Sequence, residues 1–451
     1  MNKTVVINIV GLSTSVIGEH TPFLNDYIRS KCLKQIEPLL PALTTSVQSA
    51  YVTGKYPSET GIVGNGWYDK VDSEVKFWKQ SNKLVSGDKI WDKAKNADPS
   101  FTCSIMFWWY NMYSTADYSV TPRPNYLADG RKMPDCYSHP AELRDLLQER
   151  LGQFPLFQFW GPGANIRSSQ WISDASMLSD DLYNPTLSLV YLPHLDYCLQ
   201  RHGPNIKKIA RELREIDSLL KKLITFYERK NAKIILLSEY GIAPVNNPIH
   251  INRLLRQHGF LNIRVERGLE LLDPGASKAF AVADHQIAHI YINDQTITEN
   301  VKALLKTVAG VEMVLDREQQ AVHHICHERA GDLIIVANEN SWFTYYFWLE
   351  DTKAPDYARV VDIHKKPGYD PVEMFMNSKL RAGYKLLRKK TGLRYVMDVI
   401  PLDAILIKGS HGRVNVKNEY KPIIVTDNKI DKAHIAAVDV FDIIWEQLTS
   451  L

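Results

Sequence analysis

A hydroxyl-rich segment near the N-terminus has the pattern of an anion site. Residues 41–46 read Pro-Ala-Leu-Thr-Thr-Ser, residues 51–57 read Tyr-Val-Thr-Gly-Lys-Tyr-Pro, and residues 61–65 read Gly-Ile-Val-Gly-Asn. A helix capped by Ser or Thr and ending at Gly54 would explain the pattern on structural grounds alone. A hydroxyl at a helix N-terminus would also lie where backbone N–H groups and the helix dipole favour phosphate. Both interpretations stay open at this point.

The elements around this segment are those of a parallel α/β sheet. Residues 5–10 form an apolar, β-branched run that predicts a fully buried strand, and Gly11 follows it. Residues 104–107, 187–192 and 233–237 repeat the strand pattern. Between the last two runs, residues 207–227 carry apolar side chains at helical spacing. A strand, a helix of this length and a second strand predict a βαβ crossover.

The pattern changes after residue 248. We expect a smaller α/β cap subdomain over residues 248–399, inserted between core segments 1–247 and 400–451. Its predicted elements are helices at 252–258 and 301–308 and strands at 280–292 and 332–337. The apolar residues 405–407 would return the chain to the core, and residues 433–448 would form a closing helix.

Composition describes an ordinary globular protein. The 451 residues are 45% hydrophobic and 23% charged, with a net charge of only +3. This charge does not indicate a nucleic-acid or membrane partner. Five separated cysteines favour neither a zinc cluster nor a disulfide framework. The apolar stretch 5–12 is too short to span a membrane, so we expect a cytoplasmic protein with no nucleic-acid partner and no membrane span.

Segment 41–65 resembles the type I phosphodiesterase/nucleotide pyrophosphatase branch of the alkaline phosphatase superfamily. Those proteins have a Pro-x-x-Thr segment, an aliphatic-Thr-Gly-x-x-Pro motif, and then Gly-Ile and Asn. The resemblance implies an αβα sandwich with an inserted α/β cap. It also implies that Thr44 is the nucleophile and that Asn65 binds a phosphoryl oxygen.

Three further motifs extend the resemblance and imply metal ligands. Asp196 follows the strand at 187–192, Glu239 lies in Ser-Glu-Tyr-Gly, and His411 lies in Ser-His-Gly. The family places Asp196 and His411 on one zinc and an Asp at position 239 on the other. Asp196 could equally cap a helix. The chain departs from the family pattern at Val10, Gln200 and Tyr240, where the family has Asp, His and His.

Other side chains could replace the missing ligands. His194 and His202 flank Gln200, and the remaining candidates are Asp284, His285 and His364. If residues 280–292 form one strand, His285 and His289 share a face but lie about 13 Å apart, too far for one ion. One of the two histidines, with Asp284, would then be a pocket residue. A hydrogen-bonded structural histidine is the alternative.

Aromatic and basic residues bear on the ligand. Residues 107–110 read Phe-Trp-Trp-Tyr and follow a strand, at the end where open α/β sheets bind ligands. They could stack on a ring or belong to the core. Lys365 and Lys366 could hold a second anionic group. The basic stretch between Lys385 and Arg394 is more often a solvated helix face than a binding site.

These residues predict a metal-dependent hydrolase of phosphodiesters, phosphomonoesters or phosphonates. Thr44 would attack phosphorus, a divalent metal (zinc first, one or two ions) would activate it, and the substrate would be a small phosphorylated molecule. The alternative is a catalytically reduced family member that binds such a ligand without turnover. A phosphoryl-shifting mutase ranks last. The oligomeric state stays open.

Overall fold

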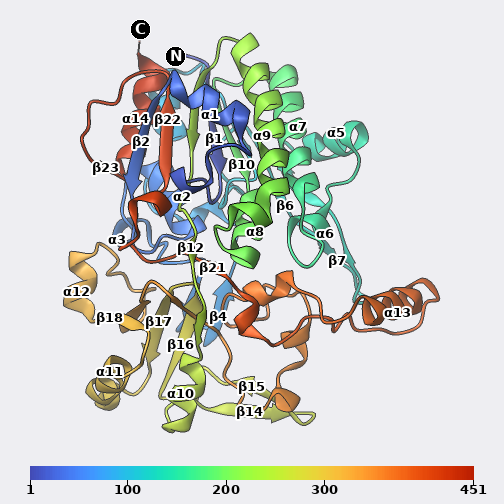
Figure 1. Ribbon diagram of the computed structural model, residues 1–451, viewed down its shortest axis with the longest axis vertical. Coiled ribbons are helices and arrows are strands. Elements are labelled where there is room, and N and C mark those ends of the chain that lie inside the picture. Colours follow the sequence, from blue (N-terminus) through green and yellow to red (C-terminus); the bar gives the residue numbers. More distant parts are fainter. Residues whose placement is uncertain (451) are drawn as a thin grey trace.

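The computed structural model describes residues 1–450, and its central element is a nine-stranded mixed sheet (Figure 1). Strand β1 (Thr4–Ile9) lies between β10 (Leu187–Leu192) and β11 (Lys233–Leu237), parallel to both. The full order is β23-β2-β22-β11-β1-β10-β5-β6-β9. The remaining strands are β2 (Cys32–Glu37), β5 (Cys103–Met106), β6 (Tyr118–Pro122), β9 (Cys136–His139), β22 (Ile423–Thr426) and β23 (Ile435–Ala436).

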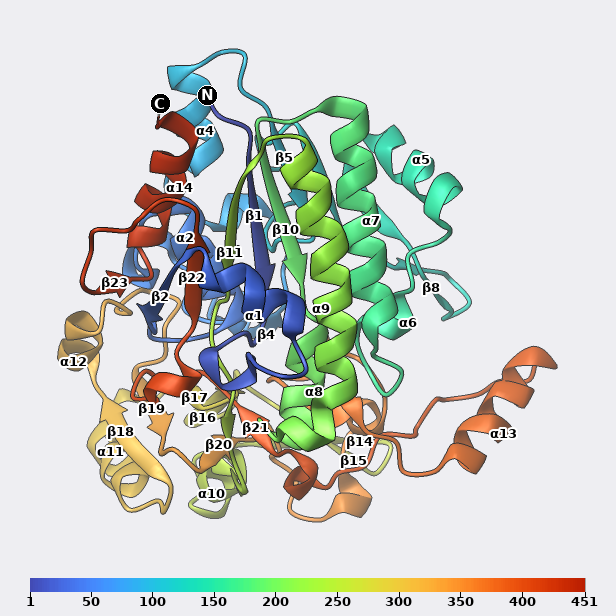
Figure 2. The same ribbon diagram turned by 45° about the horizontal axis from the view of Figure 1, so that its top comes forward.

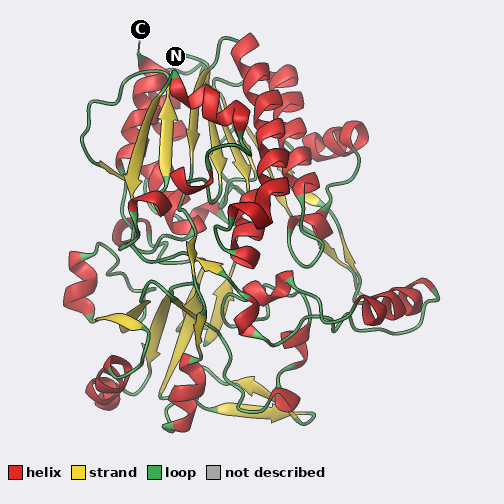
Figure 3. Ribbon diagram, viewed as in Figure 1, coloured by secondary structure: helices red, strands yellow, loops and turns green. Residues whose placement is uncertain are grey.

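Helices cover both faces of this sheet, which explains why the central strands are apolar throughout (Figure 3). One face carries α1 (Pro22–Arg29), α5 (Ala141–Leu151), α7 (Ile166–Tyr183), α8 (His194–His202) and α9 (Ile206–Arg229). The other carries α2 (Thr44–Thr53), α4 (Ile90–Ala97) and α14 (Asp439–Thr449). Figure 2 shows α7 and α9 side by side over one face. The fold is the αβα sandwich of the alkaline phosphatase superfamily.

A second body, in the lower half of Figure 1, is built on a four-stranded antiparallel sheet. Its order is β16 (Ala279–Asp284), β17 (Ile287–Ile292), β19 (Leu333–Ala337) and β18 (Val311–Leu315). Helices α10 (Ile251–Gln257), α11 (Thr298–Lys306) and α12 (Arg317–Val322) surround it, whereas α13 (Lys379–Lys390) projects sideways. Hairpin β3–β4 (Gly66–Asp69, Glu74–Phe77) comes from the N-terminal segment and packs here through Tyr68.

Short elements complete the chain. They are α3 (Pro57–Thr60), α6 (Leu156–Phe159), β7 (Asn125–Tyr126), β8 (Lys132–Met133), β12 (Ala243–Pro244), β13 (Asn247–Ile249), β14 (Ile263–Glu266), β15 (Leu269–Leu272), β20 (Ser341–Phe343) and β21 (Gly409–Ser410). Within residues 1–450, no helix is both long and apolar enough to cross a membrane.

Three local predictions differ from the structure. Residues 280–292 are not one strand but the hairpin β16–β17, because His285 turns the chain with a φ of 59°. Residues 405–407 do not themselves return the chain to the large sheet: they overlap a 3-10 turn with Ile405 exposed, and β22 rejoins the sheet further on. The closing helix starts at Asp439 rather than 433, because β23 precedes it.

A buried ion triad fixes the loop over residues 362–374 to the rest of the fold. The ammonium of Lys366 lies 2.7 Å from both Asp370 and Glu373, and all three side chains are almost fully buried. Glu373 also accepts hydrogen bonds from the Trp160 indole and the backbone N–H of Asp362. Burial disfavours the lysine charge, but the two carboxylates outweigh it and raise its pKa. Lys366 is therefore structural and not available to a ligand.

We predict that Lys366→Met lowers the free energy of unfolding by about 3–5 kcal/mol, because it leaves two buried carboxyl groups without their cation. Urea denaturation measures this change. The control Lys365→Met, whose side chain is 70% exposed, should stay within about 0.5 kcal/mol of wild type. Equal effects for the two variants would contradict a structural role for the triad.

Candidate functional site

Thr44 is the first residue of α2, which ends at Gly54 in the left-handed conformation, with φ 67°. The helix boundaries agree with the capped-helix interpretation, but the Thr44 side chain caps nothing. Its Oγ1 lies 3.0 Å from the hydroxyl of Tyr240. The hydroxyl of the next residue, Thr45, donates to the carbonyl of Gly64 at 2.8 Å. Thr44 is thus directed toward the strand ends of the sheet and not along its own helix.

A chain of hydrogen bonds connects Thr44 to Asp196. The Tyr240 hydroxyl donates to Asp196 Oδ1 at 3.4 Å, and Gln200 Nε2 donates to Asp196 Oδ2 at 2.8 Å. The hydroxyl of Tyr369 donates to Gln200 Oε1 at 3.0 Å. Burial raises the pKa of Asp196 to about 7, although Gln200 and Tyr240 oppose the shift. Gln200 and Tyr240, which stand where the family has metal ligands, therefore donate hydrogen bonds to the carboxylate of Asp196.

Glu239 is held by amides in the same way. Its Oε1 accepts from Asn8 Nδ2 at 2.6 Å and from Gln48 Nε2, while Gln48 Oε1 accepts the backbone N–H of Trp109 at 2.7 Å. Strand alternation places Asn8 on the α2 side of β1, together with Val6. Burial raises the pKa of Glu239 to about 8. The carboxyl group is therefore largely protonated at neutral pH.

Four rings stack beside these acids. Tyr240 and His411 lie nearly parallel with centroids 3.5 Å apart, His411 and His285 follow at 3.9 Å, and His285 and Tyr369 at 3.7 Å. His411 Nδ1 donates to the carbonyl of Ala42 at 2.7 Å. Burial lowers the pKa of both histidines well below its usual value. The two imidazoles are neutral and act as rings in a packed column.

Asn65 ties α2 to the second body. Its Nδ2 and its backbone N–H donate to the two oxygens of Asp284, at 3.2 and 3.0 Å, and its Oδ1 accepts from the Thr45 N–H. Asp284 Oδ1 also lies 2.7 Å from His285 Nδ1. The structure therefore brings Thr44, Asn65, Asp196, Glu239, Asp284, His285 and His411 into one neighbourhood.

The other candidate histidines lie elsewhere. His194 is buried, with Nε2 3.3 Å from Glu215 of α9. His202 ends α8 at the surface. His364 is exposed and lies against the carbonyl of Phe77 at 3.3 Å, on the wall of the cavity described below. None of the three replaces a ligand in this arrangement.

The donor set does not fit the zinc centre that the resemblance implies. Zinc requires about four N, S or O donors. Among residues 1–450, no group of three or more His, Cys, Asp or Glu side chains is arranged to hold a metal. Val10 offers no donor, and the phenol of Tyr240, a poor ligand at neutral pH, lies between Thr44 and Asp196.

A large cavity of about 1450 Å³ opens from this cluster toward the surface. Thr44, Asp196, Tyr240 and His285 line its inner end. Its walls are aromatic and its outer part is basic: the aromatic residues include Trp78, Trp109, Trp160, Tyr191 and Tyr369, and the basic ones include Arg123, Arg131, Lys132, Lys365, Lys389 and Arg394. Of the predicted aromatic run 107–110, Trp109 lines the cavity, whereas Phe107 and Trp108 belong to the core.

The model of the type I phosphodiesterase/nucleotide pyrophosphatase family matches residues 4–370, and the chain belongs to this family. An uncharacterized pyrophosphatase/phosphodiesterase of Schizosaccharomyces pombe is 25% identical over 262 residues, covering 56% of this chain and 43% of that protein. Ectonucleotide pyrophosphatase/phosphodiesterase 2 of Saccharomyces cerevisiae is 24% identical over 267 residues, 54% of this chain and 48% of that protein. The chain thus spans less than half the length of either relative.

Solved structures show the same fold. Phosphonoacetate hydrolase of Sinorhizobium meliloti 1021, in complex with phosphonoacetate, superposes with a TM-score of 0.64 at 15% identity, covering 100% of this chain and 95% of that one. Murine ectonucleotide pyrophosphatase/phosphodiesterase 5 superposes with a TM-score of 0.60 at 14% identity, covering 100% and 96%.

The raised pKa of Glu239 predicts a stability that falls as pH rises. Between its ordinary pKa of 4.5 and about 8, the folded protein holds a proton that the unfolded chain releases. Glu239→Gln cannot titrate at this position. As pH rises through this range, the free energy of unfolding of the wild type should therefore fall relative to that of Glu239→Gln, by at most about 1.4 kcal/mol per pH unit. Denaturation at several pH values measures the difference.

The exposed residue Glu228 offers a matched control, because Glu228→Gln makes the same chemical change on the surface. The free energy of unfolding of Glu228→Gln should depend on pH in the same way as that of the wild type. A Glu239→Gln curve parallel to wild type would show that the buried carboxyl group is already ionised at neutral pH.

Proposed function

We propose that the chain binds a small phosphorylated molecule in this cavity and does not turn it over by a metal-assisted route. The observation that carries the proposal is the position of the Tyr240 hydroxyl, 3.0 Å from Thr44 Oγ1 and 3.4 Å from Asp196 Oδ1. The phenol lies between the hydroxyl and the carboxylate that the family resemblance assigns to the reaction. Amide and phenol groups donate hydrogen bonds to Asp196, and amide groups donate them to Glu239.

Attack by Thr44 would require a group that accepts or withdraws its proton. A neutral threonine hydroxyl is a weak nucleophile, and its partner here is another neutral hydroxyl. Asp196 accepts hydrogen bonds from Gln200 and Tyr240, and Glu239 Oε1 accepts them from Asn8 and Gln48. Glu239 Oε2 has no hydrogen-bond partner among the described residues, but burial raises the pKa of this carboxyl group to about 8, so it is largely protonated at neutral pH. The polar network is therefore suited to holding a ligand group by hydrogen bonds and not to activating a nucleophile.

The cavity walls indicate the chemical class of the ligand. The N-terminus of α2 favours an anion at Thr44. The Trp78 and Trp109 rings lie 4.9 Å apart on the wall, where they would contact an aromatic ring of the ligand. An inactive variant of murine ectonucleotide pyrophosphatase/phosphodiesterase 5 was solved in complex with AMP, and phosphonoacetate hydrolase with phosphonoacetate. These two ligands support the proposal that the cavity binds a small phosphorylated molecule. Of the two, AMP carries both a phosphate group and an aromatic ring.

The test is calorimetric titration with AMP in the presence of a chelator. AMP should bind and be recovered unchanged, while adenosine and ribose 5-phosphate should bind more weakly. Trp109→Ala should weaken AMP binding by about 1–3 kcal/mol through lost stacking. Trp445→Ala, a partly buried tryptophan of α14 outside the cavity lining, is the control and should bind AMP like wild type. AMP should also stay unchanged without the chelator; AMP consumption under that condition, abolished when the chelator is added, would contradict the proposal.

Hydrolysis of a phosphodiester, phosphomonoester or phosphonate through Thr44 and zinc is the second candidate. The observation that favours it is the place of Thr44, at the N-terminus of α2 and on the inner wall of the cavity. A phosphodiester turnover that Thr44→Ala abolishes without loss of fold would establish it in place of ligand binding alone.

A further inference from the structure

Helix α13 projects from the second body in both ribbon views (Figures 1 and 2). Several large apolar side chains on this helix are exposed. Leu380, Tyr384 and Leu387 are 89%, 56% and 60% exposed. Their spacing of four and three residues places them on one side of the helix, where they form a continuous stripe. Single exposed apolar residues are common on proteins, but an ordered stripe of three is a surface that needs a partner.

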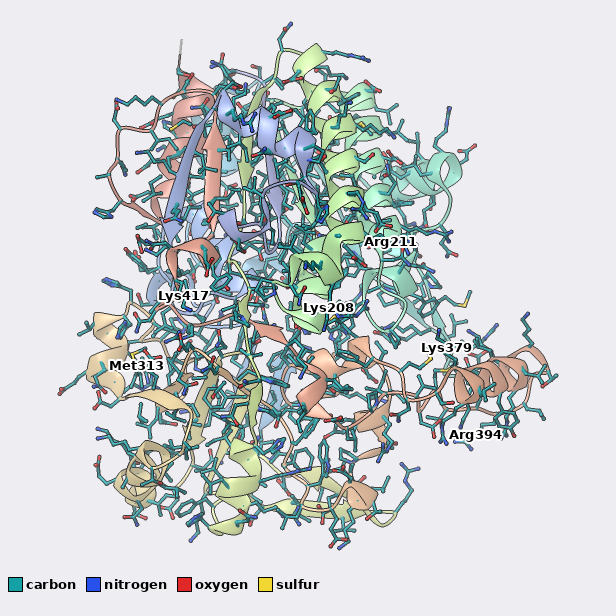
Figure 4. All side chains as sticks on the ribbon, viewed as in Figure 1. Lys208, Arg211, Met313, Lys379, Arg394 and Lys417 are labelled. Carbon is teal, nitrogen blue, oxygen red and sulfur yellow. The ribbon has the colours of Figure 1, made fainter. Side chains whose placement is uncertain are left out.

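Cations border this stripe on both sides. At 100° per residue, Lys379 and Lys390 fall on one flank and Arg381 and Arg388 on the other. Residues 379–397 contain seven Lys or Arg and no Asp or Glu. Asp398 pairs with Arg381 and Lys385, and no ion pair within residues 1–450 involves the other five. Figure 4 shows Lys379 and Arg394 at the projecting arm.

A second element at the same cavity has the same composition. Hairpin β7–β8 exposes Tyr126, Leu127 and Met133, at 59%, 38% and 40%. It also carries Arg131 and Lys132, which line the cavity. Another part of the cavity lining comes from α13 and the residues after it, through Leu386, Lys389, Leu393 and Arg394. Exposed apolar side chains and cations therefore occur on two elements that line the same cavity.

We propose that α13 and the β7–β8 hairpin dock the protein on the surface of a bilayer that contains anionic phospholipids. Such a helix lies in the plane of the interface, with its apolar stripe among the acyl chains and its cations among the headgroups. A nucleic acid would contact the Lys and Arg side chains of α13 but would not bury Leu380 and Leu387. The docked protein has the mouth of its cavity at the lipid surface. This inference does not depend on the proposed function.

Vesicle co-sedimentation of the full chain tests the proposal. Vesicles of phosphatidylcholine with phosphatidylserine should bind the wild-type protein, phosphatidylcholine alone should not, and high salt should weaken binding. Each basic residue near an anionic surface contributes about fivefold to partition, so Lys389→Gln with Lys390→Gln should reduce binding by roughly tenfold or more. Leu380→Asn with Leu387→Asn should also reduce it, because it removes the inserted stripe.

Matched controls separate the helix from the rest of the surface. Lys207→Gln with Lys208→Gln makes the same charge change on α9, and Val265→Asn with Val322→Asn removes exposed apolar side chains elsewhere. Both controls, and Thr44→Ala, should bind vesicles like wild type. Hydrogen exchange should show that residues 379–396 exchange more slowly when anionic vesicles are present than when they are absent.

Two results would overturn the proposal. One is wild-type binding that the α13 variants leave unchanged. The other is binding of the wild-type chain to duplex DNA or to an acidic protein, lost in the α13 variants, with no binding to vesicles.

Discussion

The hydroxyl of Tyr240 determines the character of the site. It contacts both Thr44 and Asp196, and its ring stacks on His411. One aromatic side chain thereby occupies the space between the residues that the family resemblance assigns to catalysis. The neighbouring side chains complement this arrangement: Gln200 donates to Asp196, and Asn8 and Gln48 donate to Glu239. The cluster is a hydrogen-bonded network with a stacked column beside it. Within residues 1–450, Glu239 Oε2, His285 Nε2 and His411 Nε2 are buried without a hydrogen-bond partner.

The electrostatics follow from the lack of a compensating cation near these acids. A buried carboxylate is costly unless a cation or several hydrogen bonds stabilise its charge. Lys366 provides such a cation for Asp370 and Glu373, and that triad is structural. Among residues 1–450, the hydrogen-bond donors to Asp196 and Glu239 are amides and a phenol, and burial raises the pKa of both acids. Burial also raises the pKa of Glu373, against the attraction of Lys366. The triad therefore differs from the cluster at the end of the sheet in having a buried cation beside its acids.

Much of the core could be predicted from the sequence, because β1, β10 and β11 are continuous apolar runs and α9 has a clear apolar stripe. Strand β2 was missed because its polar and apolar residues are mixed and only half-buried, and β22 because it has four residues. The β16–β17 turn has no Gly or Pro, so the hairpin looked like one strand. No sequence motif indicates that Tyr369 and Gln48 belong to the site. A glutamine inside an otherwise buried helix such as α2 needs a polar partner, and this could have pointed to Gln48.

Metal content is the most direct test of the central claim, that Tyr240 and its amide neighbours replace a metal centre. The full chain would be produced with zinc and manganese supplied, purified without chelator or metal-affinity resin, and measured by elemental mass spectrometry beside His411→Ala. We expect well below one equivalent of either metal in both proteins. One or two equivalents in wild type, lost in His411→Ala, would contradict it.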